Sequence, residues 1–199
     1  MSNIKIICET MNDLPDGLND KYDVEVLPVN IVFEGIEYKA GVDLNTDEFY
    51  KMLRNSQTMP STSQVTYATF KDVFEGYLKE GKKVLYLAGS AAASGTYQSA
   101  MIAKNDIESD DIQIFDTNGV SIYGGFLIQE AAKMVSEGKD MEYILEKLEE
   151  YKQNIYVYFS VDSLDYLQKG GRISGTKAAI GTLLNIKPIL KIEDGLVKQ

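Results

Sequence analysis

The 199-residue sequence contains no histidine and no tryptophan, a single cysteine and only four prolines. Without histidine it cannot supply a Ser-His-Asp triad, and a zinc site built with one cysteine is implausible. Cys8 cannot form an internal disulfide, which suits a reducing cytoplasm. No apolar run approaches the roughly 20 residues that a membrane span requires, and no signal-peptide pattern opens the chain. These absences predict a cytoplasmic protein with no integral membrane segment and no metal site.

Charge narrows the range of partners further. Thirty acidic residues against 20 basic ones give a formal net charge of −10. Such a chain repels phosphate backbones, so nucleic acid is not expected as a partner. Against this acidic background, Lys169, Arg172 and Lys177 form a local basic patch. Hydrophobic residues at 44% and charged residues at 25% are ordinary for a globular domain, so a folded core is expected.

Buried-strand patterns alternate with helical patterns over most of the chain. Apolar runs mark strands, and apolar residues at helical spacing mark the helices between them, with Asn45, Thr66 and Asp140 as helix caps. Strands separated by helices of this length predict a parallel sheet with helices on both faces. The predicted strands are residues 4–8, 84–88, 112–116 and 155–160. The fold class is therefore α/β, with a first lobe over residues 1–159.

The pattern changes after residue 160. A short helix near 164–167, a glycine turn and a helix over 178–184 precede a hairpin turn at Asp194-Gly195. We expect residues 160–199 to begin a second α/β lobe that is incomplete, and the native polypeptide to be longer or its exposed wall to be covered by another chain. Cys8 is predicted to be a small core residue, and Tyr156 and Tyr158 to pack in a sheet.

Three turns rich in hydroxyl groups or glycine lie where strand patterns give way to helix patterns. They are residues 60–64, 94–98 and 170–174. Hydroxyl donors, free N–H groups and glycines that admit close approach suit a buried anionic head group. Plain helix capping also explains Thr62 and Ser63, and an inter-domain loop also explains Gly170-Gly171-Arg172. Ser94-Gly95-Thr96 follows a buried strand directly, at the sheet edge where open α/β folds bind ligands.

In register along essentially the whole chain, these motifs resemble the DegV family of bacterial fatty-acid-binding proteins. The similarity lies in Thr62-Ser63-Gln64, in Ser94-Gly95-Thr96-Tyr97-Gln98-Ser99-Ala100, in Asp162 followed by Leu164, Tyr166 and Leu167, in Gly170-Gly171-Arg172-Ile173-Ser174, and in Lys187-Pro188-Ile189-Leu190. Several ordered motifs are far more specific than any one of them alone.

The resemblance implies a non-catalytic, two-lobed protein that holds a long-chain fatty acid between its lobes, needs no other cofactor and presents the carboxylate to a fatty acid kinase. Thr62 matches the family's carboxylate-binding threonine, and Arg172 matches the arginine assigned to kinase presentation. The other matched binding positions are Ser63, Ser90, Ala91, Ser94, Gly95 and Thr96. The sequence departs from the family at Cys8-Glu9-Thr10, where T-D-S is usual, and at Ala91, where a head-group serine is usual.

Two alternatives stay open. A phosphoryl- or acyl-transfer enzyme could use the hydroxyl-rich turns to hold phosphate, although neither a P-loop nor a Rossmann glycine motif is visible. A regulatory homologue with an impaired lipid site would fit Ala91 and the incomplete second lobe. Neither alternative accounts for the full set of ordered motifs, so lipid binding is the leading prediction.

Overall fold

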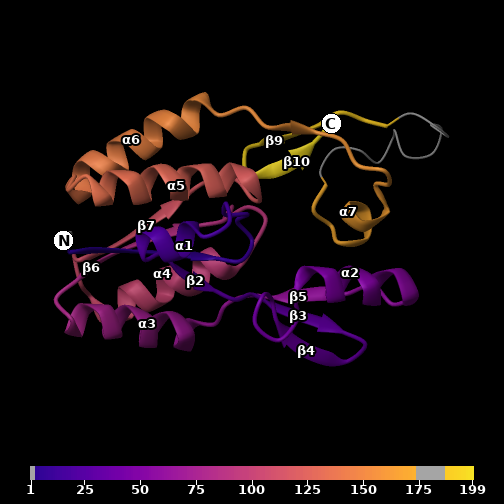
Figure 1. Ribbon diagram of the computed structural model, residues 1–199, viewed down its shortest axis with the longest axis horizontal. Helices are drawn as coiled ribbons and strands as arrows, with labels where there is room; N and C mark the ends of the chain where they lie inside the picture. The colour runs from indigo at the N-terminus through magenta and orange to yellow at the C-terminus, as the bar shows by residue number, and fades with distance from the viewer. Residues whose placement is uncertain (1–2, 174–186) are drawn as a thin grey trace.

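The computed structural model describes residues 3–173 and 187–199, which form three separate β-sheets with helices packed around the largest (Figure 1). Ser174, Lys177 and the helix predicted over 178–184 lie outside the described residues. Among the described residues, no helix is long and apolar enough to cross a membrane.

The largest sheet is parallel throughout, as its sequence pattern predicts. Its strands are ordered β2 (Glu25–Leu27), β1 (Ile4–Glu9), β6 (Lys83–Ala88) and β7 (Ile112–Asp116). All of β1 and all of β6 after Lys83 are buried, because helices cover both faces. Parallel pairing puts the carboxyl ends of all four strands at one edge, where the loops that follow them gather.

Alternate residues of β6 point into two separate cores. Leu85 and Leu87 pack into a core shared with α5 (Ile122–Ser136) and α6 (Met141–Asn154). Val84 and Tyr86 pack into a core shared with α3 (Tyr67–Lys79) and α4 (Thr96–Ile107). Figure 1 shows these two helix pairs on opposite faces of the sheet, with the short helix α1 (Leu18–Tyr22) beside α5. The α/β class is therefore confirmed, and Cys8 is a buried core residue as predicted.

The helix boundaries follow the predicted caps. The Thr66 hydroxyl accepts a hydrogen bond from Thr69 N at 3.2 Å and begins α3. The Asp140 carboxylate accepts from Tyr143 N at 2.9 Å and begins α6. Asn45 does the same for α2 (Thr46–Asn55), with Oδ1 at 3.0 Å from Glu48 N. Each cap satisfies a backbone donor that the first helical turn leaves without a partner.

A second, antiparallel sheet is ordered β4 (Ile36–Lys39), β3 (Asn30–Phe33) and β5 (Ser61–Ser63). A hairpin turn at Glu34-Gly35 joins β3 and β4, with φ of 52° and 81°. Thr62 and Ser63 were predicted to lie in a turn before α3, but both lie in β5. Thr62 pairs with Ile31 through the backbone, a contact that its own hydroxyl-rich sequence gave no signal for.

The third sheet is also antiparallel, with the order β10 (Leu196–Lys198), β9 (Leu190–Glu193) and β8 (Tyr158–Phe159). The prediction of a parallel-sheet strand over 155–160 was wrong, since only residues 158–159 are strand and they pair with β9. Tyr156 and Tyr158 are 75% and 64% exposed, so neither side chain packs as predicted. Tyr156 precedes β8, and Tyr158 lies in β8 with its side chain on a solvated face of this small sheet. Between β8 and β9 lies the helix α7 (Asp165–Lys169), close to the predicted position.

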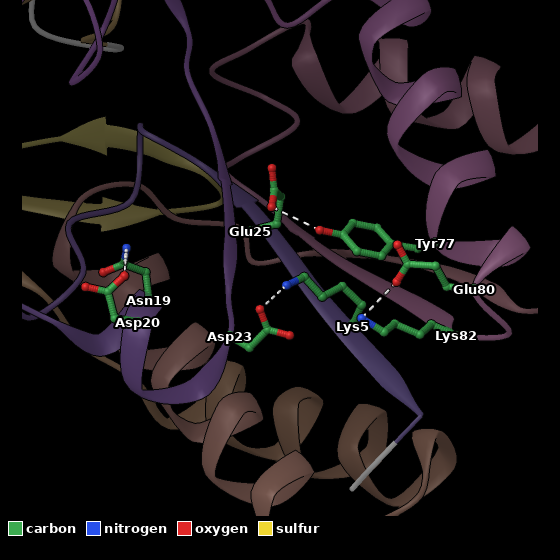
Figure 2. A network of polar contacts seen from close by, with 8 residues as sticks. All are labelled: Lys5, Asn19, Asp20, Asp23, Glu25, Tyr77, Glu80 and Lys82. Atoms are coloured by element: carbon green, nitrogen blue, oxygen red, sulfur yellow. Dashed lines mark hydrogen bonds and ion pairs between the residues drawn. The ribbon is translucent and has the colours of Figure 1, made fainter.

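Polar contacts stabilise the position of β2, which is an edge strand of the parallel sheet (Figure 2). Lys5 on β1 is only 5% exposed, and its ammonium pairs at 2.6 Å with Asp23, which precedes β2. The same ammonium lies 5.1 Å from the centre of the Tyr77 ring, whose hydroxyl donates to Glu25 on β2 at 3.0 Å. Lys82, which pairs with Glu80, approaches the Tyr77 ring at 5.2 Å. Tyr77 thus links α3 to β2 at the strand's start.

Replacing Lys5 with methionine should leave the free energy of unfolding within about 1 kcal/mol of wild type. The apolar isostere keeps the packing on Tyr77, and the exposed Asp23 regains water. Lys5→Ala also loses the packed stem and should cost about 2 kcal/mol. Urea unfolding followed by circular dichroism measures both. A loss above about 3 kcal/mol in Lys5→Met would show that the ammonium itself is required.

Candidate functional site: a cavity at the carboxyl edge of the parallel sheet

A cavity of about 390 Å³ lies where loops at the carboxyl edge of the parallel sheet meet β5 and the C-terminal segment. This volume is within the range of small-molecule sites. Most of its wall is apolar, and its polar side chains are Thr62, Ser94, Tyr166 and Arg172. The remaining lining residues are Met11, Ala93, Val120, Leu167, Gly170, Ile192, Gly195, Leu196 and Val197.

Larger hollows of about 570 and 600 Å³ exist elsewhere on the molecule. The first is lined largely by polar and charged residues of α2 and the β3–β4 hairpin, and the second lies at the opposite, amino-terminal edge of the parallel sheet. Neither contains a residue of the three turns predicted to bind an anion. The chemistry of the lining rather than its size therefore selects the 390 Å³ cavity, which brings together residues from all three predicted turns.

The turn before α4 holds Ser94 at the cavity. The Ser94 hydroxyl accepts a hydrogen bond from Thr96 N at 3.2 Å and donates one to the Thr96 hydroxyl at 3.1 Å. Thr96 is 1% exposed and does not line the cavity. Its buried side chain therefore supports the position of Ser94.

Gly95 connects two of the predicted motifs. A Cβ atom at this position would lie 2.0 Å from Oε1 of Gln64, so the Gln64 amide occupies the space that any other side chain would need. This contact brings the segment after β5 against the start of α4, with Thr62 and Ser94 on the same cavity. Ser63 is exposed in β5, where it pairs with Asn30, and it does not line the cavity.

Ser90 joins the parallel-sheet loops to the C-terminal hairpin. It is fully buried, and its hydroxyl donates to Gly195 O at 2.7 Å across 105 positions of sequence. The predicted hairpin turn at Asp194-Gly195 is present, with φ of 52° and 74°. Ala91 N donates to Asp116 Oδ1 at 3.2 Å, and neither Ser90 nor Ala91 lines the cavity. The hydrogen bond to Gly195 thus holds Ser90 in the loop after β6, behind the residues that line the cavity.

Arg172 is the one cationic side chain among the described lining residues. It is exposed, follows the turn at Gly170-Gly171, and donates from Nη1 to Gly170 O at 2.5 Å. Gly171 has φ of 68°, a conformation that glycine adopts without strain. The guanidinium therefore keeps most of its donors available to a ligand or a partner.

The role of Glu9 was not predicted from the sequence, in which this residue stands out only as a departure from a family motif. Glu9 ends β1, is 1% exposed, and accepts hydrogen bonds at 2.6 Å from both Gly89 N and the Tyr86 hydroxyl. Burial raises the pKa of Glu9 to about 7, although the bonds from Tyr86 and Gly89 lower it in part and the nearby Asp116 raises it further. An acidic residue that ends an apolar strand was the available signal, but it is also typical of a surface turn.

An α/β protein with a parallel sheet and a mostly apolar cavity at its carboxyl edge is a fold suited to binding a ligand there. Residues 3–199 match the family model described as "Uncharacterised protein, DegV family". A DegV domain-containing protein of Caldanaerobacter subterraneus is 39% identical over 198 residues, covering 100% of this chain and 70% of the relative. One from Clostridium perfringens is 41% identical, covering 98% of this chain and 68% of the relative. The chain belongs to the DegV family.

Solved structures agree with this assignment. A DegV family protein from Thermus thermophilus, described as binding fatty acid, has a TM-score of 0.90 at 32% identity, covering 100% of this chain and 70% of its own. A stearic-acid-binding protein from Eubacterium ventriosum has a TM-score of 0.90 at 29% identity, covering 98% of this chain and 69% of its own. The chain thus spans about 70% of the length of these proteins, and the predicted family is confirmed.

The raised pKa of Glu9 predicts a pH dependence of stability. Between the ordinary value of 4.5 and about 7, the folded state keeps the proton that the unfolded chain releases. The contribution of Glu9 to stability is therefore fully present below pH 4.5 and is lost as the pH rises through 7. Relative to Glu9→Gln, which cannot ionise, the wild type should lose roughly 2–3 kcal/mol between pH 5 and pH 8.

Urea unfolding of both proteins across this range provides the measurement, and Glu25→Gln is the matched control. Glu25 also accepts a hydrogen bond from a tyrosine, Tyr77, but it is only partly buried, so its removal should leave the pH profile of the wild type in place. Parallel pH profiles for wild type and Glu9→Gln would contradict the assignment to Glu9.

Proposed function

We propose that this protein binds a long-chain fatty acid in the 390 Å³ cavity, with the carboxylate near Thr62 and Ser94. The observation that carries the proposal is the composition of the cavity wall, in which hydroxyl groups and one guanidinium interrupt an otherwise apolar surface. The relatives described as binding fatty acid support it at 29–32% identity. Mass spectrometry of an organic extract of the purified protein tests it directly, and an extract without fatty acid from protein that also fails to bind added fatty acid would refute it.

Apolar burial provides the main driving force in this proposal. A chain of about 14 to 16 methylenes gains roughly 11–13 kcal/mol when buried at about 0.8 kcal/mol each. Association and ordering of the acyl chain cost a substantial part of that gain. The apolar side chains of Met11, Val120, Leu167, Ile192 and Leu196 are the surface on which the acyl chain would pack.

The head group needs donors, because an unpaired buried charge is costly. We assign donation to the hydroxyl of Thr62 and to that of Ser94, which would exchange its hydrogen bond to the Thr96 hydroxyl for one to the ligand. Ser90, Gly95 and Thr96 are assigned to holding the loops that carry these donors. Ser63 and Ala91 are the flanking positions of the proposed site, and Ala91 offers no side-chain donor of its own.

We further propose that the protein is a non-catalytic carrier which presents the fatty acid carboxylate to a fatty acid kinase in the cytoplasm. The exposed position of Arg172, beside the cavity and with free donors, supports a role in this presentation. The proposed division is a first lobe over 1–159 and a second over 160–199, and limited proteolysis with mass mapping tests whether cleavage falls near that boundary.

Thr62→Val should weaken fatty acid binding by roughly 1–3 kcal/mol, because it removes a donor at nearly constant volume. Displacement of a fluorescent fatty acid measures the affinity. The matched control is Ser61→Ala, an exposed hydroxyl on the same strand that does not line the cavity. Equal affinities of Thr62→Val and wild type would remove Thr62 from the proposed site.

Arg172→Gln should leave fatty acid affinity nearly unchanged but lower phosphorylation of the bound acid by the kinase at least tenfold, because it removes a cation near the developing phosphate charge. Lys169→Gln, an adjacent cation on α7 outside the cavity lining, is the control and should change phosphorylation less. A parallel loss of binding and phosphorylation in Arg172→Gln would place Arg172 in the head-group site instead.

A further inference from the structure

Glu9 lies one layer of side chains behind the cavity wall. Its Oε1 accepts from Gly89 N, and a Cβ at position 89 would approach that oxygen to 2.7 Å and the Met11 side chain to 3.2 Å. Met11 covers Gly89 in this way and also lines the cavity. The backbone at Gly89 therefore rests directly on the Glu9 carboxylate, and only glycine allows so close an approach.

From Gly89 the contacts continue to both sides of the cavity. The next residue, Ser90, donates to Gly195 O at 2.7 Å, and Gly195 lines the cavity from the C-terminal hairpin. The carbonyl of Ser90 also accepts from Ser94 N at 3.0 Å, and Ser94 lines the cavity from the α4 turn. A displacement of Gly89 would thus move a donor of the proposed head-group site and the hairpin opposite it.

The titratable groups that face Glu9 are acids. Tyr86 on β6 donates its hydroxyl at 2.6 Å, Asp116 lies at the end of β7, and Cys8 precedes Glu9 on β1. Glu25 on β2 adds a carboxylate near Cys8. An additional negative charge in the cavity would therefore act on a carboxylate that is already crowded by acidic neighbours.

We propose that Glu9 is a positioning residue of this site and that binding of an anionic fatty acid head group is linked to uptake of a proton by the Glu9 carboxylate. This inference rests on the proposed function. The ligand carboxylate adds a like charge behind the Met11 wall and favours the neutral form of Glu9. The proton comes from hydronium or a buffer acid in the solvent, whose bond to that proton breaks as the O–H bond of Glu9 forms.

Neutral Glu9 alters its contacts as well as its charge. A protonated carboxyl is a weaker acceptor for Gly89 N, and its O–H can donate to the Tyr86 oxygen, which then has to turn its own proton away. Because Gly89 leads into Ser90, whose carbonyl accepts from Ser94 N, the protonation state of Glu9 sets how Ser94 meets the head group. Linkage makes the effect reciprocal, so affinity for the acid rises as the pH falls through the range in which Glu9 titrates.

Isothermal titration calorimetry with palmitate at submicromolar free concentration tests this linkage, using buffers of different ionisation enthalpy to count protons. Near pH 7 the wild type should take up roughly half a proton per palmitate bound, since free Glu9 is then about half protonated. If binding raises the pKa of Glu9 by about one unit, the Kd should be roughly fivefold higher at pH 8 than at pH 6. Palmitate monomers stay ionised over this range.

Glu9→Gln should bind palmitate with no proton uptake and with the same Kd at pH 6 and pH 8. Its amide can still accept from Gly89 N and can donate to Tyr86, so folding is expected to persist. Glu25→Gln, which removes the carboxylate of the partly exposed Glu25–Tyr77 pair, should keep the proton uptake of the wild type.

Each result has a distinct consequence. A wild type that binds palmitate with pH-independent affinity and no proton uptake overturns the linkage and leaves the proposed function intact. Equal proton uptake in wild type and Glu9→Gln, or its loss in Glu25→Gln, overturns the assignment to Glu9. Failure of the wild type to bind palmitate at any pH overturns the proposed function itself and this inference with it.

Discussion

The fold depends on the burial of β1 and β6 from both sides. Residues 84–88 of β6 are fully buried, and their side chains alternate between a core with α3 and α4 and a core with α5 and α6. A strand buried in this way has to be followed by a crossover helix, and parallel crossovers bring the loops after each strand to one edge of the sheet. The cavity lies at that edge as a consequence of the packing, because Met11 follows β1 and Ser94 follows β6.

Buried polar groups then determine how the loops at that edge are arranged. Glu9 pays a large desolvation cost, which two hydrogen bonds from β6 and the following Gly89 partly offset. Ser90 extends the same connection to Gly195, so a hydroxyl inside the protein fixes the C-terminal hairpin against the first sheet. These directional contacts position the cavity walls more closely than apolar packing alone would, since a misplaced partner would leave a buried polar atom without a bond.

The sequence was sufficient wherever a local pattern carries the structural information. The central strand, the caps at Thr66 and Asp140 and the turn at Asp194-Gly195 have period, composition or turn chemistry of their own. The sequence was insufficient where the structure of a segment depends on a partner that is distant in the chain. The strand β5 has no apolar alternation and exists through backbone pairing with β3, and β8 joins β9 rather than the parallel sheet. Burial of Glu9 depends on packing against β6, and its position at the end of an apolar strand does not by itself distinguish it from an acidic residue of a surface turn.

The charge balance of the molecule bears on how the proposed carboxylate ligand would be held. The chain carries a net charge of −10, and Arg172 is the single cation among the described residues of the cavity wall. The net charge of the protein as a whole therefore repels an anion, and affinity has to come from apolar burial. In the proposed site, Thr62 and Ser94 would supply neutral donors, which solvate a carboxylate without neutralising it. A carboxylate held in this way keeps the nucleophilic charge that a phosphoryl acceptor needs, whereas a buried ion pair would withdraw it. The weak counter-charge is thus consistent with a carrier whose ligand reacts while still bound.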